Sequence, residues 1–188
     1  MKVNNLVIFI NGRAGVGKDT FVNYCREYAE ANYPCEVINI HRSDRPKKAL
    51  EMLGWDGKKN EESRKLLVEL VDFGEKFNMT SSYLKNHLKS SSINSSSPLR
   101  VIFYHVRDPQ IIDSLKKDLD TNRNDTLSFS VLIKRDSENL ESDVWGIESY
   151  RYNLYVEAQT LEGSKKAAES LIKGVLDVIL RVGGCNNE

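Results

Sequence analysis

A glycine-rich segment directly follows an apolar run near the start of the chain. The run is Leu6–Ile10, and residues 11–20 after it read Asn-Gly-Arg-Ala-Gly-Val-Gly-Lys-Asp-Thr. Gly12 and Gly17 flank four residues, and Lys18 follows. This spacing predicts a buried strand, then a loop whose backbone N–H groups turn inward, then a helix. Such a strand–loop–helix unit binds phosphate, and we call residues 12–17 the phosphate loop.

The charges of this segment indicate a nucleotide. A helix N-terminus carries roughly half a positive charge, and Lys18 adds a full charge that can reach the outer phosphates of a nucleoside triphosphate. The helix expected after the loop has one apolar face, made of Phe21, Val22, Cys25, Tyr28 and Ala29. We expect ATP to be bound by Gly12, Arg13, Ala14, Gly15, Val16, Gly17, Lys18, Asp19 and Thr20.

One position departs from the usual form of such a loop. The residue after the lysine is ordinarily Ser or Thr, whose hydroxyl binds Mg²⁺, and here it is Asp19. Thr20 comes one residue too late to replace that hydroxyl. We expect magnesium to accompany ATP and to rest on nucleotide oxygens and water, with Asp19 or Asp108 reaching it through water. The sequence predicts no firm metal ligand.

Five short apolar segments alternate with helical patterns along the chain. The expected strands are residues 6–11, 36–40, 100–106, 127–134 and 152–157. This alternation predicts a mainly parallel sheet covered by helices on both faces. The clearest helix is the last, in which apolar residues recur every three or four positions from Ala168 to Ile179. Thr160 is its expected N-cap, and Gly183-Gly184 should end it.

Two segments interrupt the alternation. Residues 42–98 lie between the second and third strands and are too long for a simple crossover. Helical patterns cover residues 46–53, 61–77 and 82–88 within this insertion. A short acidic segment, about residues 135–150, follows the fourth strand.

Three motifs resemble one superfamily of kinases. Gly17–Thr20 resembles the phosphate loop of phage-type deoxynucleoside monophosphate kinases and of phosphomevalonate kinases, where Asp likewise follows the Lys. Residues 53–59 with 64–67 resemble the acceptor-side helices, and residues 105–112, His-Val-Arg-Asp-Pro-Gln-Ile-Ile, are similar to the strand-end Arg motif. The resemblance runs in patches from about residue 5 to 180. It implies an α/β, three-layer P-loop NTPase fold with a parallel five-stranded sheet in the order 2-3-1-4-5.

The resemblance also implies ATP-dependent phosphoryl transfer to a small phosphorylated acceptor, such as a nucleoside or deoxynucleoside monophosphate. Transfer needs positive charge around the moving phosphoryl group, and the expected catalytic cations are Lys18, Arg107 and Arg135. Arg107 follows the third strand, at the edge where open parallel sheets bind ligands. The insertion would hold the acceptor, and residues 135–150 would form a lid. The expected acceptor-binding residues are Arg42, Asp44, Lys47, Arg64 and Arg107.

Several alternatives stay open. Phosphomevalonate or dephospho-coenzyme A would be phosphorylated with similar machinery. A nucleotide-binding regulator would keep the phosphate loop without efficient transfer, and the acidic lid and the lack of a strand ending in Asp favour it. His105 either orients an acceptor or is a strand-end histidine with satisfied hydrogen bonds. Trp55 either packs under the insertion or stacks on a base.

Composition narrows the partners. The chain has 188 residues, which fits one domain, and its 27 basic and 27 acidic residues give a formal net charge of 0. No global field therefore favours nucleic acid or an anionic membrane. The longest apolar runs fall short of the roughly 18 residues of a membrane helix, and no signal-peptide pattern follows Met1. We expect a cytoplasmic protein whose partners are small-molecule nucleotides, in an oligomeric state left open, with Cys25, Cys35 and Cys185 reduced.

Overall fold

The chain divides into two compact units in the computed structural model. The first unit is Met1–Asn39 with Pro98–Glu188, and the second is Ile40–Ser97. The structure describes residues 3–58, 60–77, 79–89, 99–106, 108–122, 124–135, 146–157 and 159–184. A single domain with an insertion at about residues 42–98 stays a prediction.

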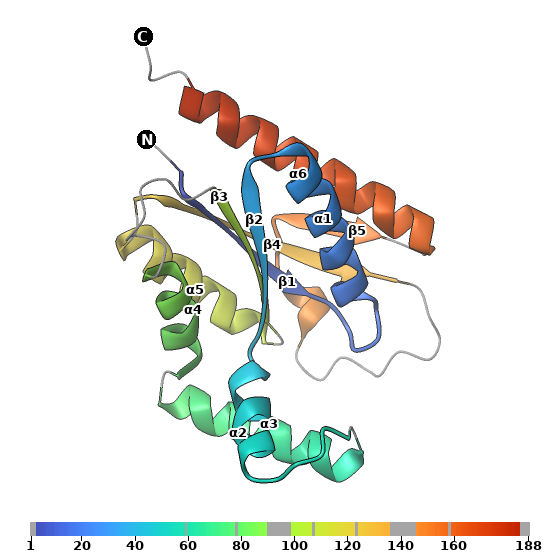
Figure 1. Cartoon of the computed structure of the whole chain (residues 1–188), viewed down its shortest axis with the longest axis vertical. Helices are drawn as coiled ribbons and strands as arrows, with labels where there is room; N and C mark the ends of the chain where they lie inside the picture. The colour runs from blue at the N-terminus through green and yellow to red at the C-terminus, as the bar shows by residue number, and fades with distance from the viewer. Residues whose placement is uncertain are drawn as a thin grey trace. The chain divides into compact units, whose positions relative to one another are not determined.

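A five-stranded sheet forms the first unit (Figure 1). Its strands are β1 (Asn5–Asn11), β2 (Cys35–His41), β3 (Leu99–His105), β4 (Thr126–Lys134) and β5 (Leu154–Glu157). The order is β2-β3-β1-β4-β5, with β1 parallel to β3 and β4, and β4 parallel to β5. Every residue of β1 is buried, as expected for the central strand of a parallel sheet covered on both faces. The predicted strand order is confirmed.

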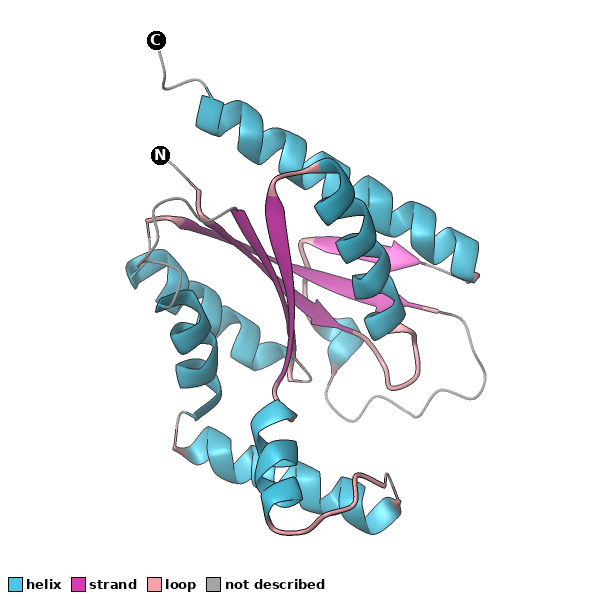
Figure 2. Ribbon diagram, in the orientation of Figure 1, coloured by secondary structure: helices cyan, strands magenta, loops and turns pink. Residues whose placement is uncertain are grey.

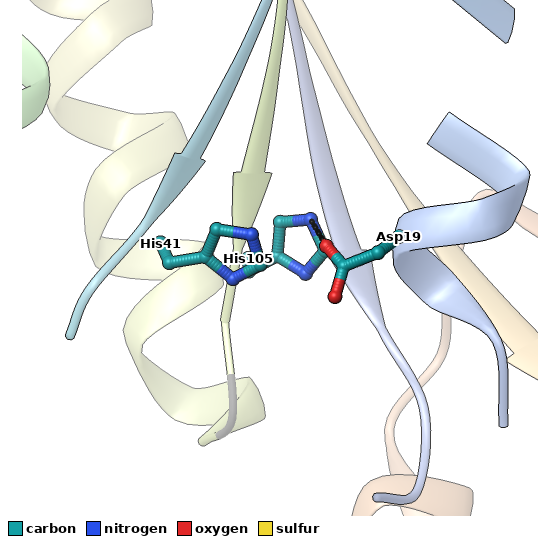
Figure 3. A group of neighbouring side chains, drawn as sticks. All are labelled: Asp19, His41 and His105. Atoms are coloured by element: carbon teal, nitrogen blue, oxygen red, sulfur yellow. Dashed lines mark ion pairs between the residues drawn. The ribbon is translucent and has the colours of Figure 1, made fainter. Parts of the chain in front are cut away.

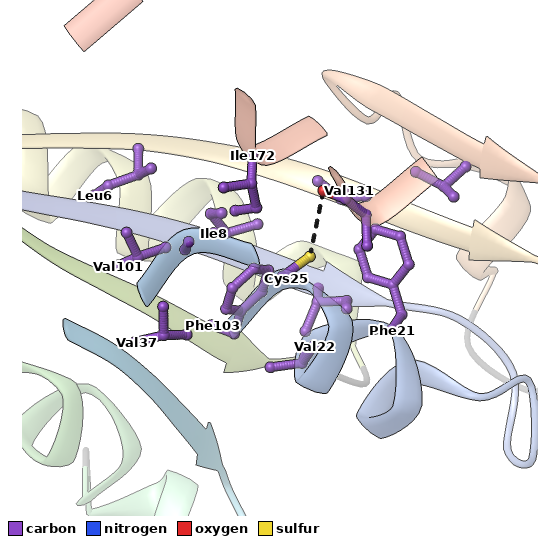
Figure 4. Close-up of a cluster of buried hydrophobic side chains, with 14 of the residues drawn as sticks. Leu6, Ile8, Phe21, Val22, Cys25, Val37, Val101, Phe103, Val131 and Ile172 are labelled. Atoms are coloured by element: carbon purple, nitrogen blue, oxygen red, sulfur yellow. Dashed lines mark hydrogen bonds between the residues drawn. The ribbon is translucent and has the colours of Figure 1, made fainter. Parts of the chain in front are cut away.

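Helices cover both faces of this sheet (Figure 2). α1 (Lys18–Asn32) packs beside α6 (Leu161–Gly184) on one face, where the Cys25 thiol lies 3.9 Å from the Ala168 carbonyl oxygen. Figure 4 shows Phe21, Val22 and Cys25 of α1 among side chains of the strands and of α6. α5 (Pro109–Asn122) lies on the other face, where Lys116 Nζ is 3.2 Å from Ser130 Oγ of β4. The predicted layers are confirmed.

The last strand begins two residues later than its pattern predicts. Residues 152–157 were expected to be extended, and β5 starts at Leu154. The Asn153 side chain explains the shift, because its Oδ1 accepts a hydrogen bond from the Ser130 backbone N–H at 2.9 Å. A side chain thus takes an N–H that strand pairing would otherwise use. The α6 start agrees with its pattern, since Thr160 Oγ1 accepts from the Gly163 N–H at 3.0 Å.

The second unit contains α2 (Asp44–Met52), α3 (Glu61–Lys76) and α4 (Met79–Lys89). These helices agree with the three helical patterns to within three residues at each end. Asn60 caps α3, since its Oδ1 accepts from the Ser63 N–H at 2.8 Å. The Trp55 Nε1–H donates to Ser63 Oγ at 3.1 Å, so the indole is fixed against the start of α3. Within the described part of the chain, no helix is both long and apolar enough to cross a membrane.

Candidate functional site

The phosphate loop runs close against β4. Asn11 ends β1, and its buried side chain accepts a hydrogen bond from the Gly12 N–H at 2.7 Å. Gly12 has a φ of 147°, and a Cβ on it would lie 2.6 Å from the Ile133 carbonyl oxygen. Only glycine fits this position, because the neighbouring atom belongs to the backbone of the sheet. The sheet therefore fixes where the loop begins.

The loop opens into α1 without a side-chain cap. Gly17 is the N-cap residue, has a φ of 91°, and offers no side chain that could cap α1. The first N–H groups of a helix have no acceptor within the helix, so those of residues 18–20 point out of its N-terminus. Asp19 is the acidic residue of this first turn. The arrangement suits an anion, because aligned N–H groups and the helix dipole favour negative charge there.

The Lys18 side chain folds back over the loop. Its Nζ donates to the carbonyl oxygens of Gly12, at 2.6 Å, and Arg13, at 2.8 Å. These bonds hold a positive charge beside the uncapped helix start. Together with the sheet order, this geometry confirms the P-loop NTPase fold. Local sequence predicted it because the strand, the glycines and the lysine are neighbours along the chain.

Arg13 links the loop to the end of the predicted lid. Its Nη2 lies 2.8 Å from Glu148 Oε1, with the two side chains 34% and 56% exposed. Glu148 belongs to η2 (Ile147–Ser149), a short 3₁₀ helix. The Arg13 Nε is buried and has no hydrogen-bond partner among the described residues. Sequence reasoning missed this pair, because no local pattern relates residues 135 positions apart.

A second polar group lies at the carboxyl ends of β2 and β3 (Figure 3). The Asn39 Nδ2 lies 3.4 Å from Asp19 Oδ1, and the Asn39 Oδ1 lies 2.8 Å from His105 Nε2. His105 Nε2 is also 3.7 Å from Asp19 Oδ1. Figure 3 also draws His41, the last residue of β2, which belongs to the second unit. The sequence singled out Asp19 and His105 but not Asn39, although a polar residue near the end of an apolar strand was a usable signal.

The expected acceptor residues fall in the second unit, apart from Arg107. Asp44 opens α2, where its Oδ2 accepts from the His41 N–H at 2.8 Å and its Oδ1 lies 3.9 Å from Lys47 Nζ. Asp44 thus serves the local structure of the helix start, whatever else it binds. Arg42 is half-buried, and Arg64 is exposed in the first turn of α3. Their binding of an acceptor stays a prediction.

Arg107 and Arg135 are the other two expected catalytic cations. Arg135 is exposed, one residue beyond the end of β4. Arg107 lies outside the described residues, as do residues 136–145 of the predicted lid. Of the three cations, Lys18 alone has a described contact with the phosphate loop. The roles of Arg107 and Arg135 stay predictions.

Several solved structures are similar to this chain at low sequence identity. No protein-family model and no curated protein matches the chain. The structure of the tunicamycin resistance protein of Deinococcus radiodurans is 12% identical, covers 91% of this chain and 95% of its own, and has a TM-score of 0.48. A gluconokinase of Sinorhizobium meliloti is 12% identical, with coverages of 96% and 98% and a TM-score of 0.42. A plasmid partition protein of Borrelia burgdorferi is also 12% identical, with coverages of 94% and 99% and a TM-score of 0.43.

Proposed function

We propose that this protein is an ATP-dependent kinase of a small phosphorylated acceptor, namely a nucleoside or deoxynucleoside monophosphate. The observation that carries the proposal is the phosphate loop itself. An uncapped helix start lies beside a lysine whose Nζ is held on two loop carbonyls, 2.6 and 2.8 Å away. Among common metabolites, nucleoside triphosphates offer the run of adjacent anionic oxygens that such a loop can hold.

The proposed roles follow from charge. The loop N–H groups and Lys18 would hold the donor phosphates, and Arg107 and Arg135 would neutralise charge during transfer. The insertion at residues 42–98 would bind the acceptor through Arg42, Asp44, Lys47 and Arg64. The segment at 135–150 would close as a lid and exclude water. We expect the protein to act in the cytoplasm on small molecules rather than on nucleic acid or membranes.

Asp19 fits a magnesium ion that is reached through water. Its side chain is 68% exposed in the first turn of α1, where P-loop proteins ordinarily present a hydroxyl to the metal. Magnesium retains several waters in protein sites, so a carboxylate can accept hydrogen bonds from them. The ion, when bound with ATP, supplies charge neutralisation across the outer phosphates.

Calorimetric titration with Mg-ATP tests the donor site. Lys18→Ala should weaken ATP binding about ten- to a hundredfold, since each charge-assisted contact contributes roughly 1.5–3 kcal/mol. Lys166→Ala is the matched control, because Lys166 is an exposed lysine on α6 whose described ion pair is with Glu162. Unchanged ATP affinity in Lys18→Ala would overturn the nucleotide assignment.

Product analysis tests the acceptor. The wild-type protein would be incubated with Mg-ATP and a panel of nucleoside and deoxynucleoside monophosphates, together with phosphomevalonate and dephospho-coenzyme A. A new diphosphate from one monophosphate supports the proposal, and transfer to another panel member reassigns the acceptor. ATP binding without transfer to any member would instead identify a nucleotide-binding regulator.

A further inference from the structure

Hydrogen-bond chemistry fixes the orientation of the Asn39 amide. A carboxylate at neutral pH only accepts hydrogen bonds, so Asn39 presents its Nδ2 to Asp19 Oδ1, at 3.4 Å. The Asn39 Oδ1 then faces His105 Nε2, at 2.8 Å, and an amide oxygen can only accept. The His105 ring therefore carries its proton on Nε2 and donates it to Asn39. One amide thus connects an imidazole to the carboxylate of the phosphate-binding helix.

The two donors to this connection are held more firmly than the carboxylate. His105 ends β3 with its side chain 9% exposed, and the next residue, Val106, continues the pairing through a 3.0 Å bond to the Ile10 carbonyl oxygen. Asn39 is half-buried on β2. The Asp19 side chain is 68% exposed on the first turn of α1. Side chains on the strands of a sheet are positioned more precisely than an exposed side chain without such support. Asn39 and His105 can therefore fix the position of the Asp19 carboxylate.

We propose that Asn39 and His105 are positioning residues that hold the Asp19 carboxylate for the magnesium of Mg-ATP, an inference that rests on the proposed nucleotide binding. Asn39 donates to Asp19 Oδ1, and His105, whose Nε2 lies 3.7 Å from the same oxygen, acts by fixing the Asn39 amide. A carboxylate anchored by one oxygen has its second oxygen restricted as well. The anchored carboxylate would accept hydrogen bonds from water bound to magnesium. Without the anchor, Asp19 would lose rotational freedom on binding, and part of the contribution of magnesium to ATP affinity would be lost.

The magnesium gain, defined as the ATP affinity in excess magnesium divided by that in EDTA, measures this role. Asn39→Ala and His105→Phe should each lower the gain about two- to tenfold, the range expected for one lost hydrogen bond. Both should keep the ATP affinity in EDTA within about twofold of wild type. Asn23→Ala removes an amide from the exposed side of α1 and should leave the gain unchanged. His105→Gln retains an N–H donor and should keep most of the gain.

A double-mutant comparison shows whether the two residues act through Asp19. In an Asp19→Ala background, Asn39→Ala and His105→Phe should have no further effect on the magnesium gain. The inference is wrong if either variant keeps the wild-type gain, if ATP affinity falls equally with and without magnesium, or if the effects persist without Asp19. Should His105→Phe fail to fold, Asn39→Ala and His105→Gln still decide the question. A wild-type protein that binds no ATP would overturn the proposed function instead.

Discussion

Replacing Gly12 with alanine should displace the phosphate loop from the sheet. A Cβ at this position would lie 2.6 Å from the Ile133 carbonyl oxygen and 3.0 Å from Val16 Cγ1. The first neighbour is backbone of β4 at a residue paired with Val156 of β5, so it cannot move aside as the end of a flexible side chain could. The φ of 147° is also strained for any residue with a side chain.

The expected cost combines two terms. Backbone strain of this kind costs about 1–3 kcal/mol, and overpacking a close contact costs a further 1–3 kcal/mol or so. Gly12→Ala should therefore lower the free energy of unfolding by about 2–6 kcal/mol, or the Tm by at least about 4 °C for a chain of this size. The variant should also bind ATP more weakly, because the loop N–H groups would no longer point together toward the phosphates.

Two other glycines serve as matched controls. Gly17 has a φ of 91°, but a Cβ added there would meet no atom within 4 Å, so Gly17→Ala should cost about 1–2 kcal/mol from backbone strain alone. Gly174 lies inside α6 with open space around it, so Gly174→Ala should stabilise the protein by about 0.5–1 kcal/mol. Urea unfolding of the three variants measures the order of their free energies of unfolding. A Gly12→Ala protein as stable as Gly17→Ala would refute the argument from the close contact.

Two further predictions concern a thiol and an ion pair. Cys25 is buried, and burial raises the pKa of its thiol. In a Cys35→Ser, Cys185→Ser protein, a thiol reagent should therefore label Cys25 no faster than the protein unfolds. Labelling that is faster than unfolding would contradict this. Glu148→Gln removes a negative charge that lies 2.8 Å from Arg13 of the phosphate loop. It should cost under about 1 kcal/mol of stability and strengthen ATP binding about two- to threefold in calorimetry at low salt. Weaker binding than in the control Glu162→Gln, an equal charge change on α6, would show that the pair supports the bound state.

The elements that sequence predicted well are those with local causes. A continuous apolar run gave β1, and the glycine spacing after it gave the loop, because strand, loop and helix start occupy consecutive residues. The strand order came with the family resemblance, since apolar patterns do not specify which strands pair. The start of β5 was wrong by two residues because Asn153 satisfies the Ser130 N–H, a contact between positions 23 apart.

The same limit applies to the site. Lys18 is close in sequence to the carbonyls that hold it, and its position was predictable. Arg13 meets Glu148, and Asp19 meets Asn39 and His105, only because the sheet brings distant segments together. Neither group has a spacing that could have been recognised along the chain. The sequence could therefore identify the phosphate loop but not the distant side chains that contact Arg13 and Asp19.

Asp19 takes part in both a local and a long-range interaction. A carboxylate in the first turn favours the helix by interacting with its dipole, and this local effect alone would justify the residue. The same charge beside a bound triphosphate opposes binding, and the opposition grows as water is excluded. A residue selected for the helix alone would need no partners on the strands, yet Asn39 and His105 both approach one of its oxygens. The departure from the usual loop therefore agrees with the proposed role of the strand ends in positioning Asp19 for magnesium.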